Sequence, residues 1–245
     1  MDKEYKKNRV YRVFEKISQH YDGANYRISF GLQTSWKKML TSQLIQKSPK
    51  DEKILDLCCG TGDIAIEIAK KRPDLQLIGA DFSPAMLKVA KQKSCGMKNI
   101  LWEKEDATKL SFGENQFAMA TISFGLRNTS DYRQVLSEML RVVKPGGHIY
   151  CLDSFVPDNA LVRPFHQIYF RYMMPLIGGG KAYREEYLWL YQSTRQFLRR
   201  KELISLCEEI GLTEIQYRKR MFGACVLIEG RSEEHTSELQ SPSWI

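Results

Sequence analysis

The chain contains the stretch Ile54-Leu-Asp-Leu-Cys-Cys-Gly-Thr-Gly-Asp63, an apolar run that leads into a glycine-rich turn. Apolar runs bounded by glycine are typical of buried strands, and the residues after the turn have the apolar spacing of a helix. The sequence therefore predicts a strand, a tight turn and a helix. Because Gly60 and Gly62 carry no side chain, we expect a ligand to lie against the backbone there. Asp56 and Asp63 flank that approach with negative charge.

Two carboxylates beside a glycine turn favour a ligand that is cationic or rich in hydroxyl groups. A phosphate-binding loop would instead use helix N–H groups, usually with a lysine. The chain has no Gly-Lys-Ser or Gly-Lys-Thr sequence at this turn. The turn by itself predicts a nucleoside site and leaves the kind of nucleoside open.

Predicted strands and helices alternate after Lys53, which is typical of a parallel sheet with crossover helices. We expect Lys144-Pro-Gly-Gly147 to end a helix and turn into the fifth strand. Residues 212–220 and 222–228 are expected to form a closing antiparallel pair. The pattern predicts an α/β fold with a doubly wound, mostly parallel, seven-stranded sheet of Rossmann-like form. The first five strands are expected at residues 53–57, 76–80, 99–102, 117–123 and 148–152, and helices at 64–71, 85–93, 133–142 and 203–210.

Residues 1–230 are expected to form one domain. Its first part, residues 1–48, is predicted to be a helical cap with helices at 9–18 and 36–46. A second helical segment, residues 157–200, is expected to be inserted as a lid and is rich in aromatic residues. Two interpretations of these aromatic residues stay open. They either pack as ordinary core or form a lid over an apolar substrate and lean on a membrane surface.

The last residues are a different kind of sequence. Residues 231–245 show neither helical nor strand periodicity. The run 231–241 resembles the in-frame translation of a common sequencing-library adapter. We therefore interpret residues 231–245 as a non-native tail that follows a natural chain truncated near Gly230, and we exclude it from the fold prediction.

The bulk composition is that of an ordinary globular protein, with 43% hydrophobic and 27% charged residues in a chain of 245. No apolar stretch approaches the ~20 residues that span a bilayer, and the charged start is not that of a signal peptide. The net charge of +8 is compatible with an anionic membrane surface. The basic residues are scattered, which argues against a nucleic-acid partner. We expect a cytoplasmic protein, with at most peripheral contact at the inner face of the membrane.

The six cysteines contain no CxxC pair of the kind that binds metal, and no metal site is expected. Cys58 and Cys59 are adjacent, which disfavours an ordinary disulfide between them. Reduced thiols are therefore expected.

Polar residues follow the carboxyl ends of the first four predicted strands, where open α/β sheets bind ligands. Asp56–Asp63 follows the first strand, and Asp81 follows the second, where it can accept hydrogen bonds from both ribose hydroxyls. Asp106-Ala107 follows the third strand, where it is suitably placed to bind the edge of an adenine ring. Ser123-Phe-Gly-Leu-Arg-Asn128 follows the fourth strand, where it would face the reacting end of a bound nucleoside cofactor.

Two cofactors compete for this arrangement. Residues 60–65 satisfy the degenerate dinucleotide pattern, and Asp81 lies near the usual distance for a ribose carboxylate. However, Asp56 and Asp63 would crowd the pyrophosphate position with like charge, and an antiparallel ending is foreign to the dehydrogenase halves. We therefore favour S-adenosylmethionine (SAM) over NAD.

Several motifs resemble known families. Asp56–Asp63 and Lys144–Gly147 resemble the class I SAM-dependent methyltransferases. A more specific resemblance, spanning about Val13 to Gly230, is to the quinone-ring C-methyltransferases of menaquinone and ubiquinone biosynthesis. Its motifs are Tyr21-Asp-Gly-Ala-Asn25, Ser29-Phe-Gly31, Trp36-Lys37 and Ser123-Phe-Gly-Leu-Arg-Asn128. The family's C-terminal signatures are only partly present, as Glu185-Glu-Tyr187-Leu188 and Phe197-Leu198.

The resemblance implies methyl transfer from SAM to a ring carbon of a reduced prenylated quinone, with demethylmenaquinol as the first choice. A benzoquinol precursor of ubiquinone presents the same phenolate and tail, so it stays open. Another small apolar acceptor, such as a sterol or phenol, and a SAM-binding sensor without turnover are the further alternatives. A homo-oligomer is compatible with the sequence, which does not set the oligomeric state.

The resemblance also implies that Thr61, Asp81, Asp106, Ala107 and Ser123 contact the cofactor; the family often has Asn where this chain has Asp106, and both offer an acceptor. With the residues of the turn, the predicted cofactor-binding set is Asp56, Gly60, Thr61, Gly62, Asp81, Asp106, Ala107 and Ser123.

Four residues are candidates for catalysis. Because a phenol has a pKa of about 10, one positioned base or cation suffices to favour the phenolate. Arg127 is the candidate for stabilising that phenolate and Asn128 for orienting it. Tyr21 and Asp22 are expected to close over the cofactor from the N-terminal helices. The alternative for Arg127 is an ion pair that caps the loop after the fourth strand.

Overall fold

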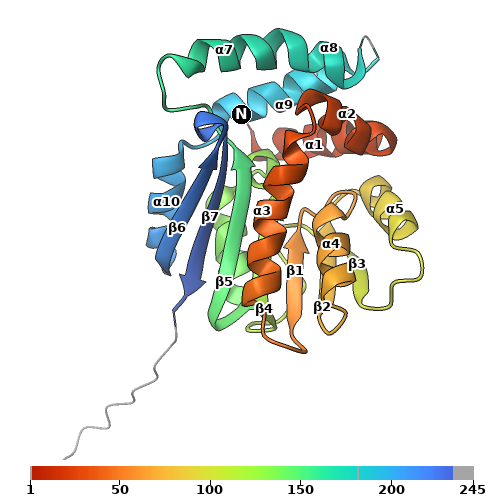
Figure 1. Cartoon of the computed structure of the whole chain (residues 1–245), viewed down its shortest axis with the longest axis vertical. Helices are drawn as coiled ribbons and strands as arrows, with labels where there is room; N and C mark the ends of the chain where they lie inside the picture. Colours follow the sequence, from red (N-terminus) through yellow and green to blue (C-terminus); the bar gives the residue numbers. More distant parts are fainter. Residues whose placement is uncertain (1, 181, 234–245) are drawn as a thin grey trace, which may run out of the picture.

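The computed structural model describes residues 2–180 and 182–233, and these residues contain a seven-stranded sheet (Figure 1). The strand order is β3-β2-β1-β4-β5-β7-β6. Strands β1 to β5 pair in parallel, and β7 pairs antiparallel with β5 and β6. This topology confirms the predicted doubly wound, mostly parallel sheet. The strands are β1 (Lys53–Leu57), β2 (Gln76–Asp81), β3 (Ile100–Lys104), β4 (Phe117–Ser123), β5 (Val143–Ser154), β6 (Leu212–Arg220) and β7 (Cys225–Ser232).

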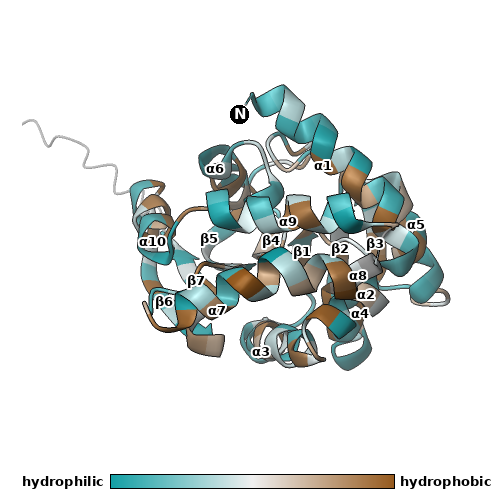
Figure 2. Ribbon diagram, turned by 90° about the horizontal axis from the view of Figure 1, so that it is seen from above, coloured by the Kyte–Doolittle hydropathy of each residue, from teal (hydrophilic) through white to brown (hydrophobic). Residues whose placement is uncertain are grey.

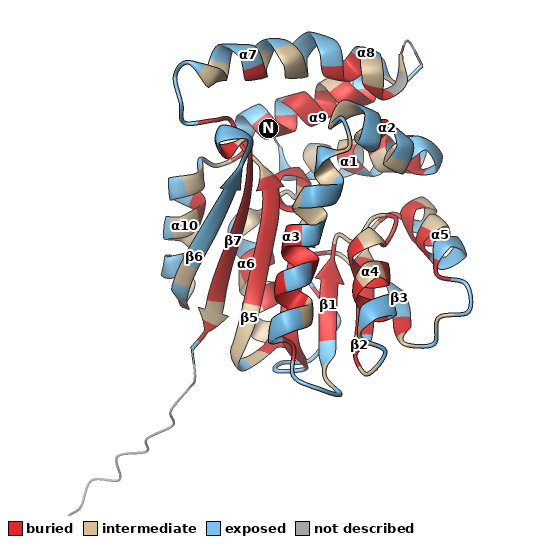
Figure 3. Cartoon of the chain, viewed as in Figure 1, coloured by how far each residue is buried: buried red, intermediate tan, exposed pale blue. Residues whose placement is uncertain are grey.

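Helices cover both faces of the sheet. On one face, α3 and α4 bury Leu40 and Ile68 against Ile54 of β1. On the other face, α6 and α10 bury Met139 and Leu203 in a second core. Strands that are buried on both faces read as continuous apolar runs, and Figure 3 shows that the central strands are buried along most of their length. The helices are α3 (Leu32–Lys47), α4 (Asp63–Lys71), α5 (Pro84–Lys93), α6 (Tyr132–Val142) and α10 (Arg200–Glu209).

A third group of helices lies across the carboxyl ends of the parallel strands. Figure 1 shows α7, α8 and α9 above the sheet with α1 and α2 beside them, and Figure 2 looks down on this layer. Val13, Ile17 and Tyr187 belong to the apolar cluster that these helices bury. Gly178 allows α8 to approach α9 closely, because a Cβ there would lie 2.9 Å from the Tyr187 ring. The helices are α1 (Lys3–Ile17), α2 (Tyr21–Ile28), α7 (Val162–Ile168), α8 (Met174–Gly179) and α9 (Arg184–Gln196).

Three segments differ from the sequence-based expectation. The last strand, expected to begin at residue 222, begins at Cys225 after a short turn at Met221–Gly223. Helix α2 occupies residues 21–28, where the sequence predicts a connection between two helices. Strand β5 begins at Val143, so Lys144–Gly147 lies within the strand and not before it. The pairing of β5 with β4 shifts register between Phe117 and Met119, which accommodates these extra residues.

The chain end also extends beyond its expected boundary. Strand β7 continues past Gly230 to Ser232, where Arg231 pairs with Thr213 of β6. Residues 234–245 of the expected tail lie outside the described residues. Within residues 2–180 and 182–233, no helix combines the length and the apolar character that a membrane span requires. All six cysteines are free thiols.

Gly147 permits a close approach of two strands. A Cβ atom there would lie 2.5 Å from the carbonyl oxygen of Ala118 and 2.6 Å from Cγ1 of Val143. Because a backbone oxygen within the sheet cannot move aside freely, we expect Gly147→Ala to lower the free energy of unfolding by about 1–3 kcal/mol. Denaturant unfolding followed by circular dichroism measures this change.

Gly113→Ala is the matched control for Gly147→Ala. A Cβ at Gly113 would meet only the flexible side chain of Gln116, so its free energy of unfolding should change by less than about 0.5 kcal/mol. Equal losses in the two variants would show that steric overlap is not the cause.

Candidate active site

Two adjoining cavities lie at the carboxyl ends of the parallel strands. The larger cavity has a volume of about 420 Å³ and the smaller cavity about 90 Å³. Open α/β sheets bind ligands at this edge, beside the point where the strand order reverses, which here lies between β1 and β4. The two cavities are neighbouring parts of one site, because they share the lining residues Tyr21, Cys58, Gly60, Ser123 and Phe124.

Asp81, at the end of β2, lines the smaller cavity. Its two carboxylate oxygens each accept one backbone N–H, from Gly60 and from Ser83, both at 2.9 Å. Burial raises the pKa of Asp81 above its usual value, and these N–H donors oppose part of that rise. Each oxygen keeps lone pairs that can accept further hydrogen bonds from hydroxyl groups.

Asp106 and Ala107 line the same cavity after β3. Asp106 accepts hydrogen bonds from Thr108 and forms an ion pair with Lys7 of α1, with 2.7 Å between Nζ and Oδ2. Burial alone would raise the pKa of Asp106, but the bonds from Lys7 and Thr108 lower it below its usual value. Helix α1 therefore reaches this end of the site through Lys7.

The two glycines of the turn have different environments. Gly60 has a φ of +55°, lines both cavities and has no atom within 4 Å of where a Cβ would lie. Gly62 has a φ of +82° and precedes α4, and a Cβ there would lie 2.3 Å from the ring of Trp102. Gly62 is not among the described lining of either cavity. The open approach expected at both glycines is present at Gly60, whereas the space at Gly62 is filled by Trp102.

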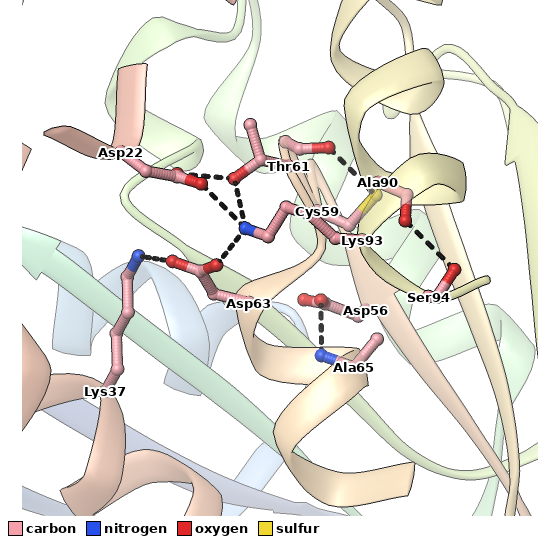
Figure 4. A network of polar contacts seen from close by, with 11 residues as sticks. Asp22, Lys37, Asp56, Cys59, Thr61, Asp63, Ala65, Ala90, Lys93 and Ser94 are labelled. Atoms are coloured by element: carbon pink, nitrogen blue, oxygen red, sulfur yellow. Dashed lines mark hydrogen bonds and ion pairs between the residues drawn. The ribbon is translucent and has the colours of Figure 1, made fainter. Parts of the chain in front are cut away.

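A network of charged side chains connects the N-terminal helices to the turn (Figure 4). Lys37 of α3 lies 2.6 Å from Asp63 at the start of α4. Lys93 of α5 pairs with both Asp63 and Asp22, and Thr61 donates to Asp22 at 2.6 Å. Burial alone would raise the pKa of Asp63, but Lys37 and Lys93 lower it to about 2. Asp22 thus holds α2 against the turn and is not among the described lining of either cavity.

Asp56 is buried at the edge of the larger cavity. Its Oδ2 accepts the backbone N–H of Ala65 at 3.3 Å, while its Oδ1 has no hydrogen-bond partner among the described residues. Burial, together with the nearby charges of Asp81 and Asp63, raises the pKa of Asp56 to about 7. A buried carboxylate with an unpartnered oxygen suits a cationic ligand group, which would favour its ionised form.

Arg127 lies in the short 3₁₀ turn after β4 and is 9% exposed. Its Nη1 donates to Asp153 of β5 at 2.5 Å and to the carbonyl oxygen of Phe124 at 2.8 Å. Asp153 also accepts the backbone N–H of Arg127 at 3.2 Å. Arg127 lines the larger cavity, and its Nε has no partner within the described chain. The ion pair considered from sequence is therefore present, in a residue that also lines the larger cavity.

Tyr21 lines both cavities and Asn128 lines the smaller one. Burial raises the pKa of Tyr21 to about 12, so its hydroxyl remains protonated at neutral pH. Asn128 donates to the carbonyl oxygen of Phe124 at 3.3 Å. The structure therefore brings three of the four catalytic candidates to the cavities and places Asp22 in the network beside them.

The backbone around the larger cavity is strained at non-glycine positions. Cys58, Phe124 and Phe222 line this cavity with φ values of +53°, +55° and +55°. L-residues rarely adopt this region, and each such residue costs on the order of 1–3 kcal/mol. Strain of this kind is characteristic of ligand-binding sites.

Some site residues carry weak sequence signals or none. Asp153 is a carboxylate that directly follows the apolar residues 149–152 of β5. A charged residue next to an apolar run is a sequence signal that could have identified it. Lys37 is part of the family motif Trp36-Lys37, but no function is predicted for it from sequence. Lys7 and Lys93 lie in ordinary charged helices, so only the fold identifies them.

The model of the ubiE/COQ5 methyltransferase family matches residues 2–231. The chain belongs to this family. It is a SAM-dependent methyltransferase. This confirms the prediction that the cofactor is SAM and not NAD.

Two similar proteins are both named demethylmenaquinone methyltransferase. One, from Geobacillus kaustophilus, is 41% identical over 227 residues, which are 91% of this chain and 96% of that protein. The other, from Staphylococcus aureus, is 38% identical over 239 residues, 97% of this chain and 98% of that protein.

Solved structures of SAM-dependent methyltransferases share the fold. One from Thermotoga maritima superposes with a TM-score of 0.66 at 17% identity and covers 91% of this chain and 100% of that chain. Phosphoethanolamine N-methyltransferase 2 of Haemonchus contortus, solved with SAM, superposes with a TM-score of 0.61 at 15% identity. The superposition covers 80% of this chain and 52% of that chain. At these identities the similarity establishes the architecture alone.

Asp56 should make SAM binding depend on pH. The ammonium group of SAM stays protonated below about pH 8, whereas Asp56, with its pKa raised to about 7, becomes protonated as the pH falls through that value. We expect the Kd of SAM to rise by up to about tenfold per pH unit below pH 7, as measured by calorimetry. In Asp56→Asn, binding should be weak and this slope absent.

Asp63→Asn is the control for this pH dependence. Because the pKa of Asp63 is about 2, its removal should change the Kd by a similar factor at every pH and leave the slope in place. A slope that persists in Asp56→Asn would show that another group titrates.

Proposed function

We propose that this chain transfers a methyl group from SAM to a ring carbon of a reduced prenylated quinone, with demethylmenaquinol as the acceptor. The observation that carries the proposal is the position of Arg127, which lines the larger, mainly apolar cavity and is nearly buried and ion-paired with Asp153. Relatives of 38–41% identity that are named demethylmenaquinone methyltransferase support a naphthoquinol over a benzoquinol.

The larger cavity suits a flat apolar ring with a hydrocarbon tail. Its polar end is formed by the glycine turn, and most of its remaining wall comes from the helices above the sheet. Pockets that are mainly apolar with a few placed polar groups are typical sites for such ligands. The apolar and aromatic lining includes Ile28, Phe165, Tyr169, Phe170, Met174 and Leu190.

The cofactor residues of the site fit SAM. We infer that Asp81 accepts from the ribose hydroxyls, because its oxygens retain free lone pairs, and that Asp106 and Ala107 bind the adenine. Asp56 has an unpartnered oxygen for a cationic group, and Gly60 leaves open space for close approach. When bound, SAM supplies a methyl group activated by its sulfonium charge.

The residues of the chain then have to activate and align the acceptor. Arg127 favours the phenolate of the quinol through the guanidinium N–H groups that its ion pair with Asp153 leaves available, because charge-assisted hydrogen bonds are strong in a buried environment. The neighbouring ring carbon becomes nucleophilic and would take the methyl group as the S–CH3 bond breaks, with S-adenosylhomocysteine as the leaving group. That carbon then loses its hydrogen as a proton, which returns to the phenolate oxygen and restores the quinol. Tyr21 remains protonated and serves as a hydrogen-bond donor, not as a base. Alignment of the two reactants can contribute roughly 7–11 kcal/mol.

Segments that line the larger cavity also carry exposed apolar side chains, which we call the apolar rim. Phe30, Phe165 and Phe222 line the cavity and are also 72%, 75% and 74% exposed. They come from the turn before α3, from α7 and from the turn between β6 and β7, which lie together at the upper end of the molecule (Figure 1). The apolar rim consists of Phe30, Leu161, Phe165, Leu176, Met221 and Phe222.

We infer that this rim contacts the membrane in which the prenylated substrate resides. Exposed apolar patches mark interaction sites. Basic residues are exposed beside these segments in the chain: Arg171 follows α7, and Lys219 and Arg220 end β6. Basic residues beside an apolar surface are attracted to anionic lipid headgroups of the cytoplasmic leaflet. A peripheral position at the inner face of the membrane would let the substrate tail remain in the bilayer.

A direct assay tests the proposed reaction. Purified protein, SAM with a deuterated methyl group and a short-chain demethylmenaquinol under reducing conditions should yield the ring-methylated quinol and S-adenosylhomocysteine in equal amounts. Mass spectrometry locates the label on the ring carbon. Methylation of the corresponding benzoquinol at an equal or higher kcat/KM would contradict the choice of acceptor, and methylation of neither would contradict the proposed function.

Arg127→Lys is the variant that tests the role of Arg127. Arg127→Ala would leave Asp153 buried without its partner, which typically costs about 3–5 kcal/mol, so lost activity there would be ambiguous. Lysine keeps a positive charge for Asp153 but lacks the rest of the guanidinium. We expect kcat to fall at least about 100-fold, as for the loss of a transition-state contact, while the Kd of SAM stays within threefold. A kcat within threefold of the wild type would exclude the proposed role.

Vesicle flotation tests the apolar rim. The double variant Phe165→Ser, Phe222→Ser should bind vesicles containing phosphatidylglycerol at least about tenfold more weakly, because two large apolar side chains are lost from the contact. Leu101→Ser is the control, since Leu101 is 58% exposed on β3 and outside the rim. If the double variant and the control bind vesicles as the wild type does, the rim is not a membrane contact.

A further inference from the structure

The helices above the larger cavity carry a polar group that the proposed reaction does not use. His166 of α7 lines the larger cavity and is only 9% exposed. Neither of its ring nitrogens has a hydrogen-bond partner among the described residues. The ring stacks on Phe170, with 4.2 Å between the centroids and 25° between the planes. The imidazole is therefore held in orientation by stacking and not by hydrogen bonds.

An unpartnered buried imidazole is costly. A neutral imidazole has one N–H donor and one acceptor nitrogen, and each buried polar group left unpaired costs about 1–3 kcal/mol. Burial lowers the pKa of His166 to about 4, so the ring is neutral at neutral pH and keeps both capacities. The nearby hydroxyl of Tyr169 is already used, since it donates to the carbonyl oxygen of Ile28.

Tyr187 of α9 repeats this pattern on the same side of the cavity. Its side chain is buried and lines the larger cavity, and its hydroxyl has no partner in the part of the chain that the structure describes. Helices α7 and α9 lie above the sheet, whereas Arg127 comes from the end of β4 (Figure 1). The residues that line the cavity therefore include buried, unpartnered polar atoms in two separate layers, with apolar side chains between them.

We propose that His166 forms a second hydrogen-bonding subsite, which binds the ring oxygen of the quinol that Arg127 does not bind. This inference rests on the proposed function, since a quinol carries two oxygens on opposite sides of its ring. Arg127 binds the oxygen next to the carbon that receives the methyl group. His166 binds the oxygen next to the prenyl-bearing carbon, either by donating its N–H or by accepting the hydroxyl proton. The subsite makes the cavity selective for a dihydroxy ring over a ring with one hydroxyl.

Ligand binding without turnover tests the subsite. The ligands are a short-chain demethylnaphthoquinol and its counterpart that lacks the hydroxyl next to the prenyl-bearing carbon, each bound in the presence of S-adenosylhomocysteine under reducing conditions. Calorimetry should show that the wild type binds the dihydroxy ligand at least about tenfold more tightly, the effect of one buried hydrogen bond. His166→Phe keeps the stacking on Phe170 and removes both nitrogens, so the ratio should fall below about threefold.

Two further variants separate hydrogen bonding from packing. His166→Gln retains a donor and an acceptor and should restore part of the preference for the dihydroxy ligand, whereas His166→Leu should lose it as His166→Phe does. Tyr172→Phe removes a polar group from the exposed side of the same lid and should leave the ratio at the wild-type value. The Kd of S-adenosylhomocysteine verifies that each variant is folded.

The outcomes distinguish the subsite from the proposed function. An unchanged ratio in His166→Phe and His166→Leu overturns the subsite and leaves the function intact. If the wild type binds neither ligand, the proposed quinol acceptor is wrong. A ratio below threefold in the wild type also overturns the subsite, because no second oxygen is then recognised.

Discussion

A buried ion pair holds the loop after β4 against the neighbouring strand β5. Asp153 on β5 is fully buried, and Arg127 after β4 is nearly so. Removing two charges from water is costly, and the structure offsets the cost with additional hydrogen bonds. The carboxylate also accepts the backbone N–H groups of Arg127 and Ser154, while the guanidinium also donates to the carbonyl oxygen of Phe124. The pair therefore fixes the loop and its side chain together, so the cation has little freedom to leave the cavity wall.

The site combines two electrostatic environments around this loop. Asp56, Asp81 and Asp106 gather at the ends of β1, β2 and β3, where we propose that the cationic cofactor of the family binds. Arg127 lines the larger cavity, whose polar end also contains Asp56. In the proposed reaction, the carboxylates favour a cationic methyl donor, and Arg127 favours an anionic ring. The strand order brings both environments together, since β1 and β4 are neighbours at the centre of the sheet.

The sequence predicts the parts of this structure that depend on local pattern. Strands β1 and β4 are found where their apolar runs place them, and polar residues after the strands meet at one edge because parallel strands end together. Features that depend on contacts between residues far apart in the sequence cannot be predicted from local pattern. Helix α2 contains Gly23, which locally favours a connection, yet it is helical against α8 and α3. The space beside Gly62 is filled by Trp102 of β3, which comes later in the chain. Asp153, the ion-pair partner of Arg127, likewise lies on a strand distant in sequence.

The network that ties α2 to the glycine turn links the turn to the wall of the larger cavity. Asp22 anchors α2 to Thr61 and Lys93, and the same helix contributes Tyr21 and Ile28 to the wall of the larger cavity. A cofactor that settles beside the turn would steady this helix and so complete the wall that the acceptor meets. By thermodynamic reciprocity, an acceptor resting on that wall would strengthen binding of the cofactor by the same free energy. The N-terminal helices would then couple the two binding events through one shared element.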